Sequence, residues 1–190
     1  MQQNIGRNTT PDGTGIASVV RNSAVSPINL SEANDGFREW AGIRFSPSED
    51  EDRTLPGNIS LATLPDNVSS TLQIHSVRGI GLLPDSSARI WLFGIRAGNA
   101  SFLAEYQAGT WSLRELPGNL PGEPLNISAA IQPSALFMKN VDIAREIFST
   151  NNSMADVSLE GTTYTITSRA EDAYRTWIFD AESGTVISRP

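Results

Sequence analysis

The C-terminal third of the chain constrains the fold most, because one amphipathic helix there is followed by a series of short strands. Residues 134–149 begin after Pro133 and place apolar side chains at a 3.6-residue period. The apolar stripe comprises Phe137, Val141, Ala144, Ile147 and Phe148. Strand patterns follow at residues 155–159, 162–169, 174–180 and 184–188. Since a striped helix packs on the apolar face of a sheet, this region predicts a two-layer α+β unit.

The upstream half predicts a second set of antiparallel strands. Its strand patterns cover residues 71–78, 88–96, 101–107 and 110–115. Turn sequences at 96–99 and 108–109 join the last three strands into a meander. Ahead of them, residues 31–44 predict a short helix with Ser31 as its N-cap. The apolar face of that helix comprises Phe37, Trp40 and Ile43.

The predicted fold class is therefore α+β, with antiparallel sheets and a packed amphipathic helix. We expect a tail or linker over residues 1–30 and an N-terminal α+β subdomain with a β-meander over residues 31–124. A C-terminal subdomain with a helix and an antiparallel sheet then covers residues 125–190. The two subdomains are either related repeats or independent units, and the sequence leaves that choice open.

The C-terminal subdomain resembles a PepSY-type unit over residues 134–188. The helix part of the resemblance is Val141-Asp142-Ile143-Ala144-Arg145-Glu146-Ile147. The closing hairpin is Trp177-Ile178-Phe179-Asp180-Ala181-Glu182-Ser183-Gly184-Thr185-Val186-Ile187. PepSY modules consist of a helix followed by antiparallel strands, and they occur near the outer face of membranes or beside secreted peptidases. The resemblance implies that this chain regulates or inhibits a peptidase.

Charge and cysteine content exclude several classes of function. The net charge of −7 argues against a general nucleic-acid or anionic-membrane binder, because counterion release needs a basic surface. The chain has no cysteine, which excludes thiol catalysis, Cys-type zinc sites, iron–sulfur clusters and disulfides. It also lacks the glycine-rich nucleotide motifs. No cofactor is predicted.

Asn-x-Ser/Thr sequons are more frequent than the composition predicts. They begin at Asn8, Asn29, Asn58, Asn67, Asn99, Asn126 and Asn151. Chance would give about two or three such sites, so they indicate an exported surface that is open to glycosylation. The alternative is a loop composition rich in Ser, Thr and Asn. We predict an extracellular or cell-envelope location, with a signal or membrane anchor of the full-length protein lying outside this chain.

Candidate nucleophiles and bases form no recognisable motif. His75 is the only histidine, and no Gly-x-Ser-x-Gly elbow accompanies it. Lys139 is the only lysine and has no serine three residues before it. The segment Asp12-Gly13-Thr14-Gly15 departs from the Asp-Thr-Gly of aspartic proteases by one inserted glycine.

Carboxylates offer the remaining candidates for chemistry. The acidic run at residues 49–52 supplies oxygen ligands but lacks the spacing of a calcium loop. A glycoside hydrolase needs two acids facing each other across a cleft, and Asp85, Glu105 and Glu115 are the acids considered for that role. We nominate no catalytic, cofactor-binding or metal-binding residue.

Five aromatic residues lie on or beside the predicted strands. They are Trp91, Tyr106, Trp111, Tyr174 and Trp177. An exposed row of such rings would bind carbohydrate or peptide, whereas a small α+β domain buries them in its core, which is what we predict.

The predicted function is a non-catalytic extracytoplasmic domain that binds a protein, a peptide or an envelope component. A carboxylate-based hydrolase and a purely structural envelope component are the alternatives. A deep cleft with two convergent acids would favour the enzyme. A flat apolar patch or an unpaired sheet edge would favour the binding module.

Overall fold

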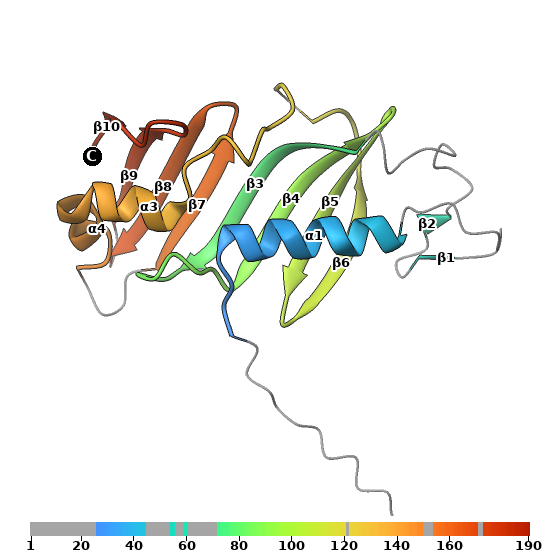
Figure 1. The fold of residues 1–190 in the computed structure, drawn as a ribbon, viewed down its shortest axis with the longest axis horizontal. Coiled ribbons are helices and arrows are strands. Elements are labelled where there is room, and N and C mark those ends of the chain that lie inside the picture. The colour runs from blue at the N-terminus through green and yellow to red at the C-terminus, as the bar shows by residue number, and fades with distance from the viewer. Residues whose placement is uncertain are drawn as a thin grey trace, which may run out of the picture.

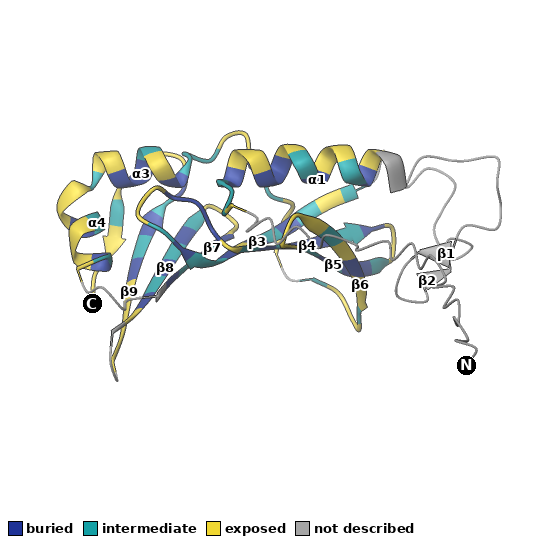
Figure 2. Cartoon of the chain, turned by 90° about the horizontal axis from the view of Figure 1, so that it is seen from below, coloured by how far each residue is buried: buried dark blue, intermediate teal, exposed yellow. Residues whose placement is uncertain are grey.

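In the computed structural model, helices cover one face of a wide antiparallel sheet (Figures 1 and 2). The structure describes residues 26–44, 54–55, 59–60, 72–120, 122–149, 154–170 and 173–190. Within these residues the main sheet has eight strands, and a second sheet has two. This arrangement of helices on an antiparallel sheet confirms the α+β class predicted from the sequence.

The eight strands follow each other across the main sheet in an order that brings the two halves of the chain together at its centre. That order is β10 (Val186–Ser188), β9 (Ala173–Asp180), β8 (Thr163–Ala170), β7 (Met154–Glu160), β3 (Leu72–Leu82), β4 (Ile90–Ala97), β5 (Ala100–Gln107) and β6 (Thr110–Leu116). The short strands β1 (Thr54–Leu55) and β2 (Ile59–Ser60) pair with each other and, among the described strands, with no other. Each predicted strand of the main sheet is present, although β3 continues four residues beyond its predicted end.

Each half of the chain contributes a four-stranded meander, and the first strands of the two meanders pair. The pairing between β3 and β7 is antiparallel and runs from Ser76 opposite Glu160 to Leu82 opposite Ala155. Helix α1 (Leu30–Arg44) lies over β3 to β6, and helices α3 (Pro133–Lys139) and α4 (Val141–Ile147) lie over β7 to β10 (Figure 1). Both halves therefore have their helices on the same side of the sheet, as Figure 2 shows.

Helix α1 begins with a reciprocal pair of hydrogen bonds between Asn29 and Glu32. The main-chain N–H of Glu32 donates to Asn29 Oδ1 at 3.0 Å, and the N–H of Asn29 donates to Glu32 Oε2 at 2.9 Å. This is a capping box, which satisfies two of the free N–H groups at a helix start. The prediction of Ser31 as N-cap is wrong by two residues, because Asn29 accepts the capping bond.

The predicted helix over residues 134–149 is two short helices that meet at Asn140. Asn140 has φ −121° and ψ 53°, outside the helical region, so the helical path stops there and begins again. Beyond the break, the second helix buries Ile143 and Ile147, while Val141 is 46% exposed. The prediction that Val141 belongs to the apolar stripe is therefore wrong.

The core lies between the helices and the sheet face below them. In the first half, the ring of Phe37 from α1 stacks on Phe93 of β4 with their centroids 5.2 Å apart. In the second half, Trp177 and Phe179 of β9 are fully buried. Residues that alternate with these on the same strands point to the opposite face, which the helices leave open.

Candidate functional site

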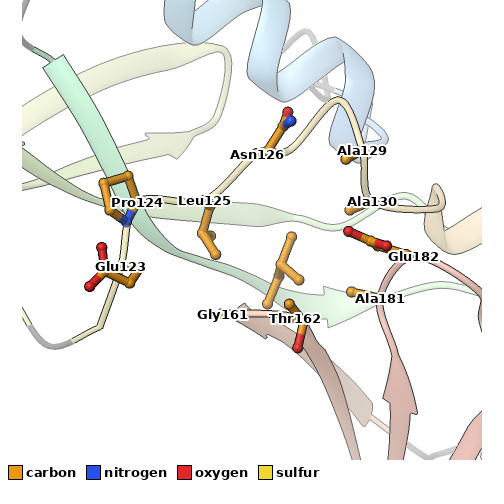
Figure 3. A pocket seen from close by; sticks show the side chains of 11 residues that line it. Glu123, Pro124, Leu125, Asn126, Ala129, Ala130, Gly161, Thr162, Ala181 and Glu182 are labelled. Carbon is orange, nitrogen blue, oxygen red and sulfur yellow. The ribbon is translucent and has the colours of Figure 1, made fainter.

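A hollow of about 190 Å³ lies where the connection between the two halves meets the second meander (Figure 3). Three segments form its walls: the connection itself, the turn between β7 and β8, and the turn between β9 and β10. Its lining residues are Glu123, Pro124, Leu125, Asn126, Ala129, Ala130, Leu159, Gly161, Thr162, Ala181 and Glu182. Most of these side chains are apolar or small, so the interior of the hollow is apolar.

The hollow exists because the connection crosses from one side of the sheet to the other. Leu120 lies on the open side, since a Cβ on Gly94 would point away from the helices and meet Leu120 Cδ2 at 3.3 Å. The connection then passes the end of β3, where the N–H of Leu125 donates to the carbonyl of Ile74 at 2.6 Å. Strand β7 has already ended opposite Ser76, which leaves this edge of β3 free for the connection.

The turn between β9 and β10 is closed by the side chain of Asp180. Its Oδ1 accepts hydrogen bonds from the main-chain N–H of Ser183 at 2.7 Å and from the Ser183 hydroxyl at 2.6 Å. These bonds from Ser183, with a smaller contribution from the charge of Lys139, hold the pKa of Asp180 below its ordinary value. Gly184 completes the turn at φ +68°, a conformation that favours glycine.

The same turn is fastened to the helices above it. Lys139 Nζ donates to the carbonyl of Ser183 at 2.6 Å, and the side-chain amide of Asn140 donates to the carbonyl of Gly184 at 3.0 Å. A Cβ on Gly184 would lie 3.2 Å from side-chain atoms of both Ile131 and Leu136, so the turn packs closely on this region. The Asp-Ala-Glu-Ser-Gly segment thus has a structural role, which is to dock α3 on the sheet.

Main-chain hydrogen bonds tie the three walls of the hollow together. The N–H of Ile131 donates to the carbonyl of Ala181 at 2.7 Å, and the N–H of Ala181 donates to the carbonyl of Thr162 at 2.8 Å. These two bonds link the connection to the β9–β10 turn and that turn to the β7–β8 turn. The walls are consequently fixed by the backbone and not by side-chain packing alone.

Among the described residues that line the hollow, two are acidic and none is basic. Glu123 and Glu182 are both exposed, but the carboxylate of Glu123 points away from the hollow in Figure 3. Figure 3 shows the Glu182 side chain reaching from its turn toward the hollow, above Ala181. Neither glutamate carries a signal in the sequence, because each lies in a loop between strong strand and helix patterns. The hollow could be found only from contacts between segments far apart in the chain.

The structure does not bring the carboxylates considered for hydrolysis together. Glu105 pairs with Ser112 and Glu115 pairs with Phe102, so the two acids point to opposite faces of the sheet. Asp85 lies in the loop between β3 and β4, where hydrogen bonds from Ser87 hold the pKa of its carboxyl below the ordinary value. These three acids therefore form no facing pair.

His75 is a buried residue with a structural contact to the connection. It is 4% exposed, at the irregularity in the β3–β4 register between Ile74 and Ser76. Its Nδ1 donates to the carbonyl of Gly122 at 3.0 Å, which helps to hold the connection against β3. Within the described residues, no cluster of three or more His, Asp or Glu side chains is placed to hold a metal ion.

The aromatic residues on the strands do not form an exposed row. Trp91 and Trp177 are fully buried, Tyr106 and Trp111 are half-buried against the core, and Tyr174 is exposed. The prediction that these rings are core is confirmed for the two buried tryptophans and is wrong for Tyr174, whose ring lies beside the Arg169 guanidinium at 5.4 Å.

Several residues considered from the sequence lie outside the described part of the chain. These are Asp12-Gly13-Thr14-Gly15, the acidic run at residues 49–52, and the sequon residues Asn8, Asn58, Asn67 and Asn151. Of the other sequon residues, Asn29 caps α1, while Asn99 and Asn126 are exposed.

A second candidate surface is the sheet face that the helices leave open. Ile80 and Ile90 pair directly across β3 and β4, and Leu92 follows on the same face. Leu103 of β5 pairs with Gly94 and lies on this face as well. All four aliphatic side chains are partly exposed, and together they form an apolar patch, here called the open-face patch.

Comparison with known proteins identifies a shared fold. No protein-family model matches the chain, and no curated protein matches it significantly. The structure is similar to the crystal structure of a protein from Clostridium difficile 630 described as a "putative lipoprotein". The TM-score is 0.50 and the sequence identity 13%, with 86% of this chain and 93% of that chain covered. At this identity the similarity establishes the fold alone.

No helix among the described residues has the length and apolar content to span a bilayer.

Proposed function

We propose that this chain is a non-catalytic binding module of the cell envelope, and that a protein partner binds the open face of its sheet. The observation that carries the proposal is the open-face patch of Ile80, Ile90, Leu92 and Leu103. Contiguous apolar side chains on an ordered surface are typical of protein interaction sites, because a partner removes them from water.

The surroundings of the patch suit a protein partner. Arg78 lies beside Leu92 on the same face and makes an ion pair of 2.9 Å with Asp156. Glu105 pairs with Leu92 from the other side. An apolar centre with charged groups at its rim is the usual composition of a protein interface.

Envelope location is supported by three observations. The sequons exceed the number expected by chance, the similar crystal structure is described as that of a "putative lipoprotein", and the second half has two helices followed by antiparallel strands. The PepSY resemblance adds that the partner is a secreted peptidase, which the module would regulate or inhibit. This step rests on fold-level analogy.

The experiment compares two variants of the immobilised full chain in an envelope extract of the source organism. Leu92→Arg places a charge in the open-face patch, whereas Met138→Arg makes a similar change on the helix side, at a side chain that is 72% exposed. We expect mass spectrometry to find a protein that wild type and Met138→Arg retain and Leu92→Arg loses. Thermal melting confirms that both variants are folded. Equal retention by all three proteins would refute the proposed surface.

A further inference from the structure

We infer that the hollow of Figure 3 is a socket for a basic side chain, a lysine or arginine presented by a protein partner. The inference is independent of the open-face patch. Leu159, which lines the hollow, is buried and pairs with Val77 on the sheet face covered by the helices. The hollow therefore opens on the helix side of the sheet, and its occupant contacts a different part of the molecule.

The interior of the hollow fits the aliphatic stem of such a side chain. Leu125 and Leu159 provide apolar surface, while Ala130 and Ala181 leave space because their side chains are short. Lysine and arginine bury their methylene groups along apolar surface while the charged end stays near water. A hollow that is apolar within and open at its rim accommodates both parts.

The charge at the rim selects a cation over a neutral or acidic group. Glu123 and Glu182 are the charged residues of the lining, and both are acidic. The only lysine of the chain, Lys139, is held at the carbonyl of Ser183 and does not line the hollow. An incoming ammonium or guanidinium group therefore meets the carboxylate of Glu182, and none of the described lining residues is basic, whereas a carboxylate ligand meets like charge.

The hollow is formed before any ligand enters. The hydrogen bonds from Ile131 to Ala181 and from Ala181 to Thr162 hold its walls at 2.7 and 2.8 Å. The turn at residues 126–130 is closed by a bond from the N–H of Ala129 to the carbonyl of Asn126 at 3.0 Å. Since the walls are already ordered, binding need not pay the entropy of ordering them.

The test uses single-residue probes and the full, isotopically labelled chain. Nα-acetyl-lysine N-methylamide and the matching arginine and norleucine derivatives are titrated while the main-chain amide signals are followed by NMR. Norleucine has the lysine stem without the charge. We expect the basic probes to shift the signals of Thr162, Ala130 and Ala181, and to bind about fivefold or more tightly than norleucine, as one charge-assisted contact implies. Equal binding of lysine and norleucine probes, or shifts elsewhere only, would overturn the inference.

Three variants locate the charge and the cavity. Glu182→Gln removes the carboxylate but keeps the shape of the side chain, and we expect it to lower the affinity for the lysine probe about threefold to tenfold. Glu160→Gln changes the net charge equally at an exposed acid outside the lining and should leave the affinity unchanged. Ala129→Trp fills the mouth of the hollow from an exposed position and should abolish the shifts. Equal weakening by Glu182→Gln and Glu160→Gln would contradict a specific socket.

The outcome of the probe titration can be distinguished from the outcome of the capture experiment on the open-face patch. Leu92→Arg lies on the opposite side of the sheet and should bind the lysine probe as wild type does. If Leu92→Arg loses the envelope partner while probe binding persists, the two surfaces act independently. If the probes fail to bind, the socket is refuted while the evidence for the open-face patch is unaffected.

Discussion

The side-chain amide of Asn140 donates hydrogen bonds to two carbonyls, one of Leu136 in its own helix at 2.9 Å and one of Gly184 in the β9–β10 turn at 3.0 Å. Asn140 is the residue at which α3 ends and α4 begins. The residue at the helix break therefore also holds the β9–β10 turn, 44 positions along the chain. It also brings the helix pair into contact with the turn that walls the hollow.

We expect Asn140→Ala to lower the free energy of unfolding by about 1–2 kcal/mol, because both bonds are lost and the Gly184 carbonyl loses a partner. Chemical denaturation measures this change. Asn119→Ala is the matched control, since Asn119 is exposed in the connection and its replacement should change stability by less than about 0.5 kcal/mol. If the two variants are equally stable, the two hydrogen bonds of the Asn140 amide do not stabilise the fold.

The indole of Trp91 occupies the space in which a side chain at position 79 would lie, so this position requires a glycine. A Cβ at position 79 would lie 2.8 Å from Trp91 Cζ3 and 3.0 Å from Val157 Cγ1, both within the core. We expect Gly79→Ala to destabilise the protein by about 1–3 kcal/mol through overpacking. Combining it with Trp91→Phe should cost less than the sum of the single changes, because the smaller ring relieves the clash.

The control for Gly79 is another glycine at which the same substitution has the opposite effect. Gly42 lies in α1, and a Cβ there would meet no atom within 4 Å. Gly42→Ala should therefore stabilise the protein by about 0.5–1 kcal/mol through helix propensity. Thermal or urea unfolding measures the change in the free energy of unfolding for both variants. Changes of the same sign in the two variants would contradict this account.

Local patterns predicted the strands and turns well, because those depend on neighbours in the chain. The strand patterns at residues 162–169 and 174–180 predict β8 and β9 to within one residue at each end. The start of α1 was also readable, since Asn29 precedes Glu32 by the spacing of a capping box. The prediction of Ser31 overlooked that pair.

Contacts between distant segments account for what the sequence did not reveal. The apolar stripe of residues 134–149 continues past Asn140, so periodicity alone predicts one helix, whereas the residue at the break is bonded to Gly184, far along the chain. Similarly, the glycine at position 79 of β3 is explained by Trp91 of β4, whose ring occupies the place of a Cβ there. The hollow depends on Leu125 meeting Ile74 and Ile131 meeting Ala181, contacts that no local pattern encodes.

Asp180 should make the β9–β10 turn sensitive to acid. Because its folded pKa is lowered by the bonds from Ser183, its ionised form stabilises the fold above the ordinary carboxyl pKa of about 4, and this contribution is lost as the pH falls through the folded value. Asp180→Ala should melt at a lower temperature than wild type at pH 7, with a difference that shrinks below about pH 4. Asp180→Asn keeps an acceptor oxygen and should lose less. A difference that stays constant from pH 7 to pH 3 would exclude ionisation of Asp180 as its source.

Tyr164 should make the fold sensitive to alkali, for the opposite reason. Its ring is 1% exposed and its hydroxyl finds no hydrogen-bond partner in the described structure, so burial raises its pKa well above the ordinary value. The neutral phenol is favoured in the folded state, and wild type therefore loses stability as the pH rises past about 10, where the unfolded chain ionises.

Tyr164→Phe removes an unpaired polar group, so we expect it to be as stable as wild type or about 1 kcal/mol more stable at pH 7. Its advantage should grow between about pH 9 and pH 11, as measured by urea unfolding. The exposed ring of Tyr174 provides the control, and Tyr174→Phe should keep the wild-type alkaline transition. An alkaline transition unchanged in Tyr164→Phe would show that this hydroxyl does not control it.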